Sequence, residues 1–214
     1  MKKKIGIIGS GIVAKTLGAG CLKHGYEVML GTRDTSKLSE WNATHPEAKI
    51  GSFEEAAAFG DIVILAVSGR VAKDALAMAG KQHLSGKTVI DTTNPIAEAP
   101  PENGVLRFFT NLDESLMEQI QHAYPDVHFV KSFSCVGNAF MVDPAFESKP
   151  SMFICGDDAQ AKSVVSSLLH EFGWEVEDMG NVEAARAIEP LCMLWCIPGM
   201  RENKWSHAFR LMKN

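Results

Sequence analysis

The sequence contains no uninterrupted apolar stretch of about 18 residues, the length that a membrane-spanning helix requires, so no membrane span is expected. It also lacks an excess of basic residues, because 21 Lys and Arg stand against 26 Asp and Glu, and the formal net charge is −5. This balance argues against nucleic acid or an anionic membrane as the main partner. It remains compatible with a local basic pocket for a phosphate.

Paired cysteine spacings are also missing. The number of cysteines is odd, and most of them have apolar neighbours in the sequence: Cys21, Cys135, Cys155, Cys192 and Cys196. This pattern is typical of reduced, buried thiols, and it predicts a cytoplasmic protein. Cys192 and Cys196 would share one helix face, but no nearby histidine or second cysteine pair completes a zinc set, so no metal is expected.

The N-terminus has some features of a secretion signal, because lysines at positions 2–4 precede an apolar run. Lys15 interrupts that run, and a glycine motif explains the same residues better. We therefore expect no secretion signal here.

The alternation of apolar segments with amphipathic ones predicts an α/β fold with a doubly wound, mostly parallel sheet. The expected strands cover residues 5–8, 26–30, 48–51, 61–67, 88–91, 127–131, 151–155 and 174–178. The expected helices cover residues 12–24, 34–43, 53–59, 71–82, 112–123, 158–172 and 182–196. We expect a single domain over residues 1–214, in which residues 181–214 form a C-terminal helical extension. Asn181 is expected to cap its helix, and Pro198-Gly199 to end it.

The N-terminal part of the chain is the most informative. An apolar segment precedes the turn sequence GSGIVA (residues 9–14), and an amphipathic segment and a second apolar segment follow. Strand, glycine turn, helix and strand in this order form the first βαβ unit of a dinucleotide-binding fold.

Each small residue of this G-x-G-x-x-A turn has a physical role in such a site. Gly9 permits the tight turn, Gly11 lets the backbone approach a pyrophosphate, and Ala14 lets helix and strand pack closely. The diphosphate would rest on the free N–H groups and the positive dipole end of the helix. A purely structural glycine turn is the alternative.

The end of the second strand predicts which dinucleotide binds. An NAD site places an acidic residue there, about 20 residues beyond the glycines, on the ribose 2′-hydroxyl. This sequence has Gly31-Thr32-Arg33 instead. Because a hydroxyl and a guanidinium can donate several hydrogen bonds to a 2′-phosphate, NADP is favoured over NAD. Lys37 could add a second positive charge, and Asp34 is expected to turn away and cap the next helix.

Two later strands end at the same edge of the sheet, where doubly wound folds bind ligands. Val67 and Ser68 are therefore predicted to line the cofactor. Asn94 offers a donor and an acceptor and Pro95 restricts the backbone, which suits the nicotinamide end of a cofactor. An ordinary Asn-Pro turn is the alternative.

Two loops follow these strands. Residues 96–110 form the longest irregular stretch, and loops of that length are commonly functional flaps or covers. Residues 132–138, SFSCVGN, are small and hydroxylated, which predicts the floor of a pocket. An exposed connector is the alternative for the second loop.

Taken together, these motifs resemble the F420-dependent NADP oxidoreductase family. The front half of the resemblance rests on IGIIGSGIVAKTL, GTR, DIVILAV and TNP, and the back half on KSFSCV and GWEVEDMGNVEAARAIEPL. The fold is also similar to the NADPH domain of the STEAP metalloreductases and to the N-terminal domain of pyrroline-5-carboxylate reductases. The resemblance implies a homodimer in which NADP is held by Ser10, Ile12, Val13, Thr32, Arg33, Val67, Ser68, Asn94 and Pro95.

The chemistry that we expect is hydride transfer between NADPH and a flavin-like or F420-like acceptor, in which the cofactors react and the protein orients them. No Ser/His/Asp set is evident, and no catalytic residue is assigned. Reduction of a small carbonyl or imine is an alternative that would need a proton donor, for which Lys131 and His207 are the only candidates. A second alternative is an NADP-binding sensor or regulatory protein without turnover.

Overall fold

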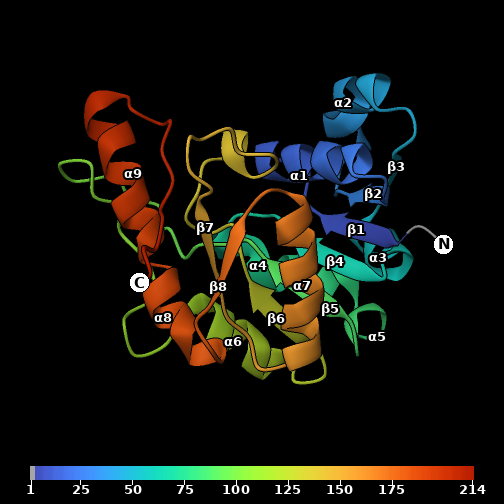
Figure 1. The fold of residues 1–214 in the computed structure, drawn as a ribbon. Coiled ribbons are helices and arrows are strands. Elements are labelled where there is room, and N and C mark those ends of the chain that lie inside the picture. Colours follow the sequence, from blue (N-terminus) through green and yellow to red (C-terminus); the bar gives the residue numbers. More distant parts are fainter. Residues whose placement is uncertain (1–2) are drawn as a thin grey trace.

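The computed structural model describes residues 3–214. Met1, the first residue of the expected domain, and Lys2, the first of the three lysines, lie outside the described residues. Six parallel strands form one sheet in the order β3-β2-β1-β4-β5-β6 (Figure 1). Their bounds are β1 Lys4–Ile8, β2 Glu27–Gly31, β3 Lys49–Gly51, β4 Ile62–Leu65, β5 Thr88–Asp91 and β6 His128–Lys131. This strand order reverses between β1 and β4, which confirms the doubly wound α/β class.

A second, two-stranded sheet stands beside β6. Its strands, β7 (Ser151–Ile154) and β8 (Glu175–Asp178), are parallel and are connected by α7 (Ala159–Glu171). A single antiparallel bridge between Lys131 and Cys155 joins this pair to the edge of the main sheet.

Helices cover both faces of the main sheet (Figure 1). On one face lie α1 (Ile12–Lys23) and α7, and on the other lie α3 (Phe53–Phe59), α4 (Ala72–Ala79) and α6 (Leu116–Ala123).

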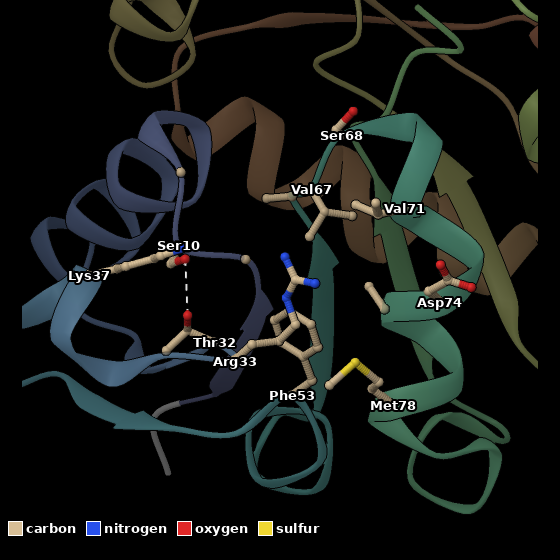
Figure 2. Close-up of a pocket in the computed structure, with 14 residues that line it drawn as sticks. Ser10, Thr32, Arg33, Lys37, Phe53, Val67, Ser68, Val71, Asp74 and Met78 are labelled. Atoms are coloured by element: carbon tan, nitrogen blue, oxygen red, sulfur yellow. Dashed lines mark hydrogen bonds between the residues drawn. The ribbon is translucent and has the colours of Figure 1, made fainter. Parts of the chain in front are cut away.

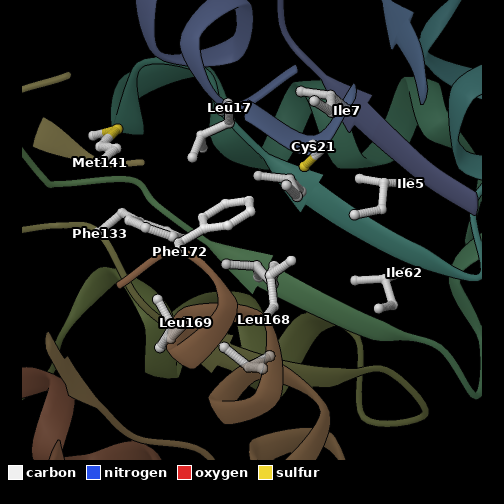
Figure 3. Close-up of a cluster of buried hydrophobic side chains, with 14 of the residues drawn as sticks. Ile5, Ile7, Leu17, Cys21, Ile62, Phe133, Met141, Leu168, Leu169 and Phe172 are labelled. Carbon is white, nitrogen blue, oxygen red and sulfur yellow. The ribbon is translucent and has the colours of Figure 1, made fainter. Parts of the chain in front are cut away.

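The strands β1, β4, β5 and β6 supply both hydrophobic cores, because successive side chains point to opposite faces. In β4, Ile64 joins the core under α1 and α7, whereas Leu65 joins the core under α3 and α4. Figure 3 shows the first core, in which Leu17 of α1 and Leu168 of α7 approach the same strands. Burial on both faces explains why the strands read as continuous apolar runs.

Two predicted helices have different bounds in the structure. The predicted helix over residues 71–82 is wrong as a single element, because Gly80 adopts a φ of 82° between α4 and α5 (Lys81–Leu84). A φ of this sign ends an α-helix, and glycine accepts it at little cost. The predicted helix over residues 112–123 begins only at Leu116, because Ser115 and Glu118 form a capping box there.

The segment predicted as one short helix over residues 34–43 is a 3-10 turn, Thr35–Leu38, followed by α2 (Ser39–Thr44). The predicted helix over residues 53–59 is confirmed as α3, and Ser52 and Glu55 form a capping box at its start.

The C-terminal segment also differs from the prediction. Instead of one helix over residues 182–196, a 3-10 turn (Val182–Ala184) leads into α8 (Ala185–Ile188) and then α9 (Leu191–Glu202). Asn181 makes no side-chain cap, and Pro190 precedes α9, where its missing N–H costs nothing.

Pro198 lies inside α9 and does not end it, contrary to the prediction. The proline removes one backbone hydrogen bond, to the carbonyl of residue 194, whose side chain is 55% exposed. The helix continues because the buried Trp195 and Cys196 hold it against residues 96–110, and it ends at Asn203, which has a φ of 53°. Among residues 3–214, no helix has both the length and the apolar character needed to cross a membrane.

Gly6→Ala tests the close contact between the central strand and α3. A Cβ at position 6 would lie 2.0 Å from the carbonyl oxygen of Ala56, so the substitution should lower the free energy of unfolding by about 1 to 3 kcal/mol, as overpacking does. Urea denaturation measures the change. Unchanged stability would mean that α3 can shift away from β1 without cost.

Candidate functional site

Two adjoining cavities lie at the carboxyl edge of the main sheet, around the point where the strand order reverses. The first, of about 250 Å³, lies between the glycine turn, the end of β2 and α4 (Figure 2). The second, of about 360 Å³, extends from the start of α1 to the loop after β5. Both cavities are lined by Gly11, Ala66, Val67 and Ser68.

The glycine turn contains two glycines, and the structural explanation for a glycine differs between the two positions. Gly9 has a φ of 146°, and a Cβ there would lie 2.2 Å from the carbonyl oxygen of Ala66, so the protein's own packing requires glycine. Gly11 has an ordinary φ of −77°, and a Cβ there would meet no atom within 4 Å. The space above Gly11 is therefore clear for a ligand.

The amino end of α1 is open as well. Gly11 is its N-cap, and no side chain among residues 3–214 caps it, so the amides of the first turn have no side-chain partner in the described part of the chain. These amides and the helix dipole suit a negatively charged group.

Hydroxyl groups and two cations form the polar side of the first cavity. The Thr32 hydroxyl lies 3.1 Å from the Ser10 hydroxyl, which joins the end of β2 to the glycine turn. Arg33 and Lys37 are exposed and line the same cavity. Within residues 3–214, neither side chain has a hydrogen bond or an ion pair (Figure 2 shows the Arg33 guanidinium reaching into the cavity).

Asp34 turns away from these cations, as predicted. Its carboxylate accepts hydrogen bonds from the Ser36 hydroxyl at 2.7 Å and from the Ser36 amide at 3.0 Å. These bonds hold the pKa of Asp34 below its ordinary value, and the charge of Lys37 acts in the same direction. The Asp34 carboxylate therefore caps the 3-10 turn that follows it.

An apolar wall, which the sequence analysis missed, closes the other side of the first cavity. Val71, Ala75 and Met78 line it from α4 and the turn before it, and Phe53 lines it from α3 (Figure 2). The spacing of the first three residues is that of one helix face, which is the signal that could have indicated them. Asp74 also lines this wall.

The second cavity is lined by Ile12 and Val13 at one end and by Asn94 at the other. The Asn94 amide nitrogen donates to the carbonyl oxygen of Ser134 at 2.7 Å, whereas its Oδ1 atom is buried without a partner in the described structure. Of the residues that the structure describes, no ionisable side chain lines this cavity. The other lining residues, which are not among the predicted site residues, are Ala66, Gly69, Thr92, Thr93 and Ile96.

Pro95 is the predicted site residue that lines neither cavity. It is buried, and its carbonyl oxygen accepts the amide of Phe109 at 2.8 Å. All the other predicted site residues line one or both cavities: Gly9, Ser10, Gly11, Ile12, Val13, Thr32, Arg33, Lys37, Val67, Ser68 and Asn94.

The two loops after β5 and β6 are more closely packed against the rest of the protein than the sequence predicted. Residues 96–110 form a hairpin-like loop, bridged between Ile96 and Phe108, and Leu106 packs into a cluster with Trp195 of α9. Only Ile96 of this loop lines the second cavity. Residues 132–136 are buried, so the exposed connector is wrong for this loop. None of residues 132–138 lines either cavity, so the predicted pocket floor is not confirmed.

Lys131, a candidate proton donor, is fully buried. Its Nζ lies 2.6 Å from Asp91 Oδ2, 3.0 Å from Glu189 Oε1 and 2.8 Å from the carbonyl oxygen of Thr93, which occupies all three N–H groups. Burial alone would lower the pKa of Lys131, but the two carboxylates raise it above its ordinary value. Lys131 is therefore a structural cation here.

His207, the other candidate donor, also lies outside the two cavities. Its Nε2 is 2.8 Å from the carbonyl oxygen of Trp195, on whose ring it stacks. It lines a separate surface groove with Pro198 and Trp205.

The five cysteines are free and buried. Burial raises the pKa of Cys135 and of Cys155 to about 12, which keeps both thiols protonated at neutral pH. Across residues 3–214, no group of three or more His, Cys, Asp or Glu side chains is arranged to hold a metal ion.

Known proteins are similar to this chain over the residues that form most of both cavities. Residues 4–95 match the family model described as NADP oxidoreductase coenzyme F420-dependent. A crystal structure of a protein from Arthrobacter sp. FB24, provisionally described as an F420-dependent NADP-reductase, is 30% identical. It covers 100% of both chains with a TM-score of 0.92.

Two curated proteins are similar over part of their length. The F420-dependent NADP reductase of Methanocaldococcus jannaschii is 30% identical over 142 residues, which are 66% of this chain and 63% of that protein. The metalloreductase STEAP3 of Rattus norvegicus is 27% identical over 199 residues, which are 91% of this chain and 38% of that protein. The chain thus spans little more than a third of the length of the curated metalloreductases that it matches.

Ser36→Ala should raise the pKa of Asp34 toward the ordinary value of about 3.9, because the carboxylate loses the bond that favours its charged form. The bond stabilises the fold only above the ordinary carboxyl pKa, and this contribution is lost as pH falls through the lowered folded-state pKa. An NMR titration of the Asp34 carboxyl carbon measures the shift, with Ser167→Ala as a distant control. An unchanged pKa would assign the effect to the Ser36 amide and to Lys37.

Proposed function

The chain belongs to the F420-dependent NADP oxidoreductase family, and on this premise we propose that it transfers hydride between NADPH and a flavin-like or F420-like acceptor. NADP(H) would lie across the two cavities, with its adenosine end in the first and its nicotinamide end in the second.

At the adenosine end, Arg33 and Lys37 would hold the 2′-phosphate together with the hydroxyls of Thr32 and Ser10. Two cations without partners and two adjacent hydroxyls are a suitable donor set for a dianionic phosphate. The adenine would pack on the apolar wall of α4, beside Met78.

The diphosphate would rest on the glycine turn and on the amides at the start of α1, beside Ile12 and Val13. The clear space above Gly11 supports this placement, because packing within the protein gives no reason for glycine there. The nicotinamide end would then reach Val67, Ser68 and Asn94, with Pro95 supporting Asn94 from behind.

The observation that carries the choice of acceptor is the absence of ionisable side chains from the lining of the second cavity, all of which belongs to the described residues. When bound, NADPH supplies the hydride. The surrounding residues can bind the ring, orient it and exclude water, but their only side-chain O–H groups are the weakly acidic hydroxyls of Ser68, Thr92 and Thr93. A carbonyl or imine needs that proton as it is reduced, whereas a flavin-like ring can take a hydride without one from the protein.

A panel of acceptors tests this proposal directly. We expect the purified protein to oxidise NADPH rapidly with F420, FMN or FAD and slowly with small imines and carbonyls, measured by the loss of nicotinamide absorbance. A ferric chelate belongs in the panel because of the similarity to metalloreductases. Faster turnover with imines than with any ring would contradict the proposal, and tight NADPH binding without turnover on any acceptor would favour a sensor.

Arg33→Ala should weaken NADPH binding by about 1.5 to 3 kcal/mol and leave NADH binding nearly unchanged, because only NADPH presents a phosphate to the guanidinium. Isothermal titration of both nucleotides measures this difference. Arg107→Ala is the matched control, because Arg107 is exposed, pairs with Glu102 and lines neither cavity. Equal losses for NADPH and NADH would contradict the assignment of the 2′-phosphate site.

A further inference from the structure

A buried ionic cluster lies directly behind the second cavity. It consists of Lys131 at the end of β6, Asp91 at the end of β5 and Glu189 after α8, and all three side chains are essentially inaccessible to solvent. None of them lines the proposed cofactor site. The two neighbouring strand ends and the C-terminal segment therefore meet at one cation.

The charges in this cluster are balanced by backbone amides as well as by side chains. Two carboxylates face one ammonium, and Glu189 also accepts the amides of Leu116 and Met117, each at 3.0 Å. These amides belong to the first turn of α6, whose dipole favours a negative charge at that end. Glu189 thereby ties α6 and α8 to Lys131.

The cluster also holds the loop that follows β5. Asp91 Oδ1 accepts the Thr93 hydroxyl at 2.7 Å and the Thr93 amide at 2.9 Å, and Lys131 donates to the Thr93 carbonyl oxygen at 2.8 Å. Every polar group of Thr93 is thus bonded to one of these two residues. Because Thr93 precedes Asn94, these bonds set where Asn94 enters the second cavity.

The strand end at β6 holds Asn94 from the other side. The Asn94 amide donates to the carbonyl oxygen of Ser134, and the chain reaches that position through Phe133, which is buried with a φ of 60°. A non-glycine residue in this conformation is strained and persists only where its surroundings determine it. Lys131 is two residues before Phe133, at the point where the cluster anchors this turn.

We propose that Lys131 is a positioning residue for the nicotinamide end of the cofactor, acting through Asp91 and Thr93 on Asn94. This inference rests on the proposed function. Lys131 itself touches neither cavity and donates no proton to substrate. It fixes the geometry of the loop that carries Asn94, and a change at Lys131 should therefore affect the nicotinamide end and spare the adenosine end.

Lys131→Met tests this inference through the affinities for two probes, NADPH and adenosine 2′,5′-bisphosphate, measured by isothermal titration. The second probe carries the 2′-phosphate and adenine but no nicotinamide. We expect the affinity for NADPH to fall about 10-fold or more, the equivalent of a lost hydrogen bond to the ligand, whereas the affinity for the bisphosphate should stay within about twofold.

Lys87→Met is the matched control. Lys87 lies just before β5, at the opposite end of that strand, and its Nζ donates to the carbonyl oxygens of Ala57 and Gly60, each at 2.7 Å. Its loss should lower the thermal unfolding temperature without changing the ratio of the two affinities.

Asp91→Asn provides a second variant in case Lys131→Met does not fold, because it keeps the size of the side chain and leaves Lys131 paired one to one with Glu189. It should reduce the NADPH affinity in the same direction and by a smaller factor. An equal loss of both affinities in these variants, or no loss in Asp91→Asn, would overturn the positioning role.

The wild-type protein separates this inference from the proposed function. If it binds neither probe, the proposed function fails. If it binds the bisphosphate as tightly as NADPH, the nicotinamide is not held, and the positioning role is overturned while the 2′-phosphate site stands.

Discussion

The structure depends on a close approach of two main-chain segments at the centre of the sheet. Gly9, directly after β1, lies against the carbonyl oxygen of Ala66, directly after β4, at a distance that leaves no room for a side chain. The amide of Ala66 in turn donates to the carbonyl oxygen of Ile8 at 2.9 Å. These contacts set the gap between the strand ends where the sheet order reverses, and both cavities open from that gap.

The two cavities differ in chemistry although they adjoin. Within residues 3–214, the first combines two unpaired cations, hydroxyls, the Asp74 carboxylate and an apolar wall, and its cations and hydroxyls are groups that suit a phosphorylated nucleoside. The second contains backbone, small side chains and one amide, but no acid or base. Under the proposed function, the first cavity would supply most of the binding groups and the second would hold the nicotinamide away from ionisable side chains, which is consistent with a cofactor that carries the chemistry itself.

The C-terminal segment is connected to the surroundings of the second cavity by two separate contacts. Glu189 reaches Lys131 behind the second cavity, and α9 holds residues 96–110, whose first residue lines that cavity. Neither contact places a C-terminal side chain inside the crevice. The segment therefore supports the site from behind rather than supplying groups to it.

The sequence by itself determined the doubly wound α/β fold class, the glycine turn, the two cations after β2 and the capping role of Asp34. Each of these follows from local rules: apolar runs for buried strands, small residues where backbones approach, and capping by short acidic side chains. Tertiary structure alone decided the role of Lys131, the burial of residues 132–136 and the continuation of α9 through Pro198. These depend on residues distant in the chain, since the partners of Lys131 are 40 and 58 positions away and Trp195 packs against Leu106. A local pattern cannot show which distant groups will compensate a buried charge or a missing hydrogen bond, and only the packed chain brings those groups together.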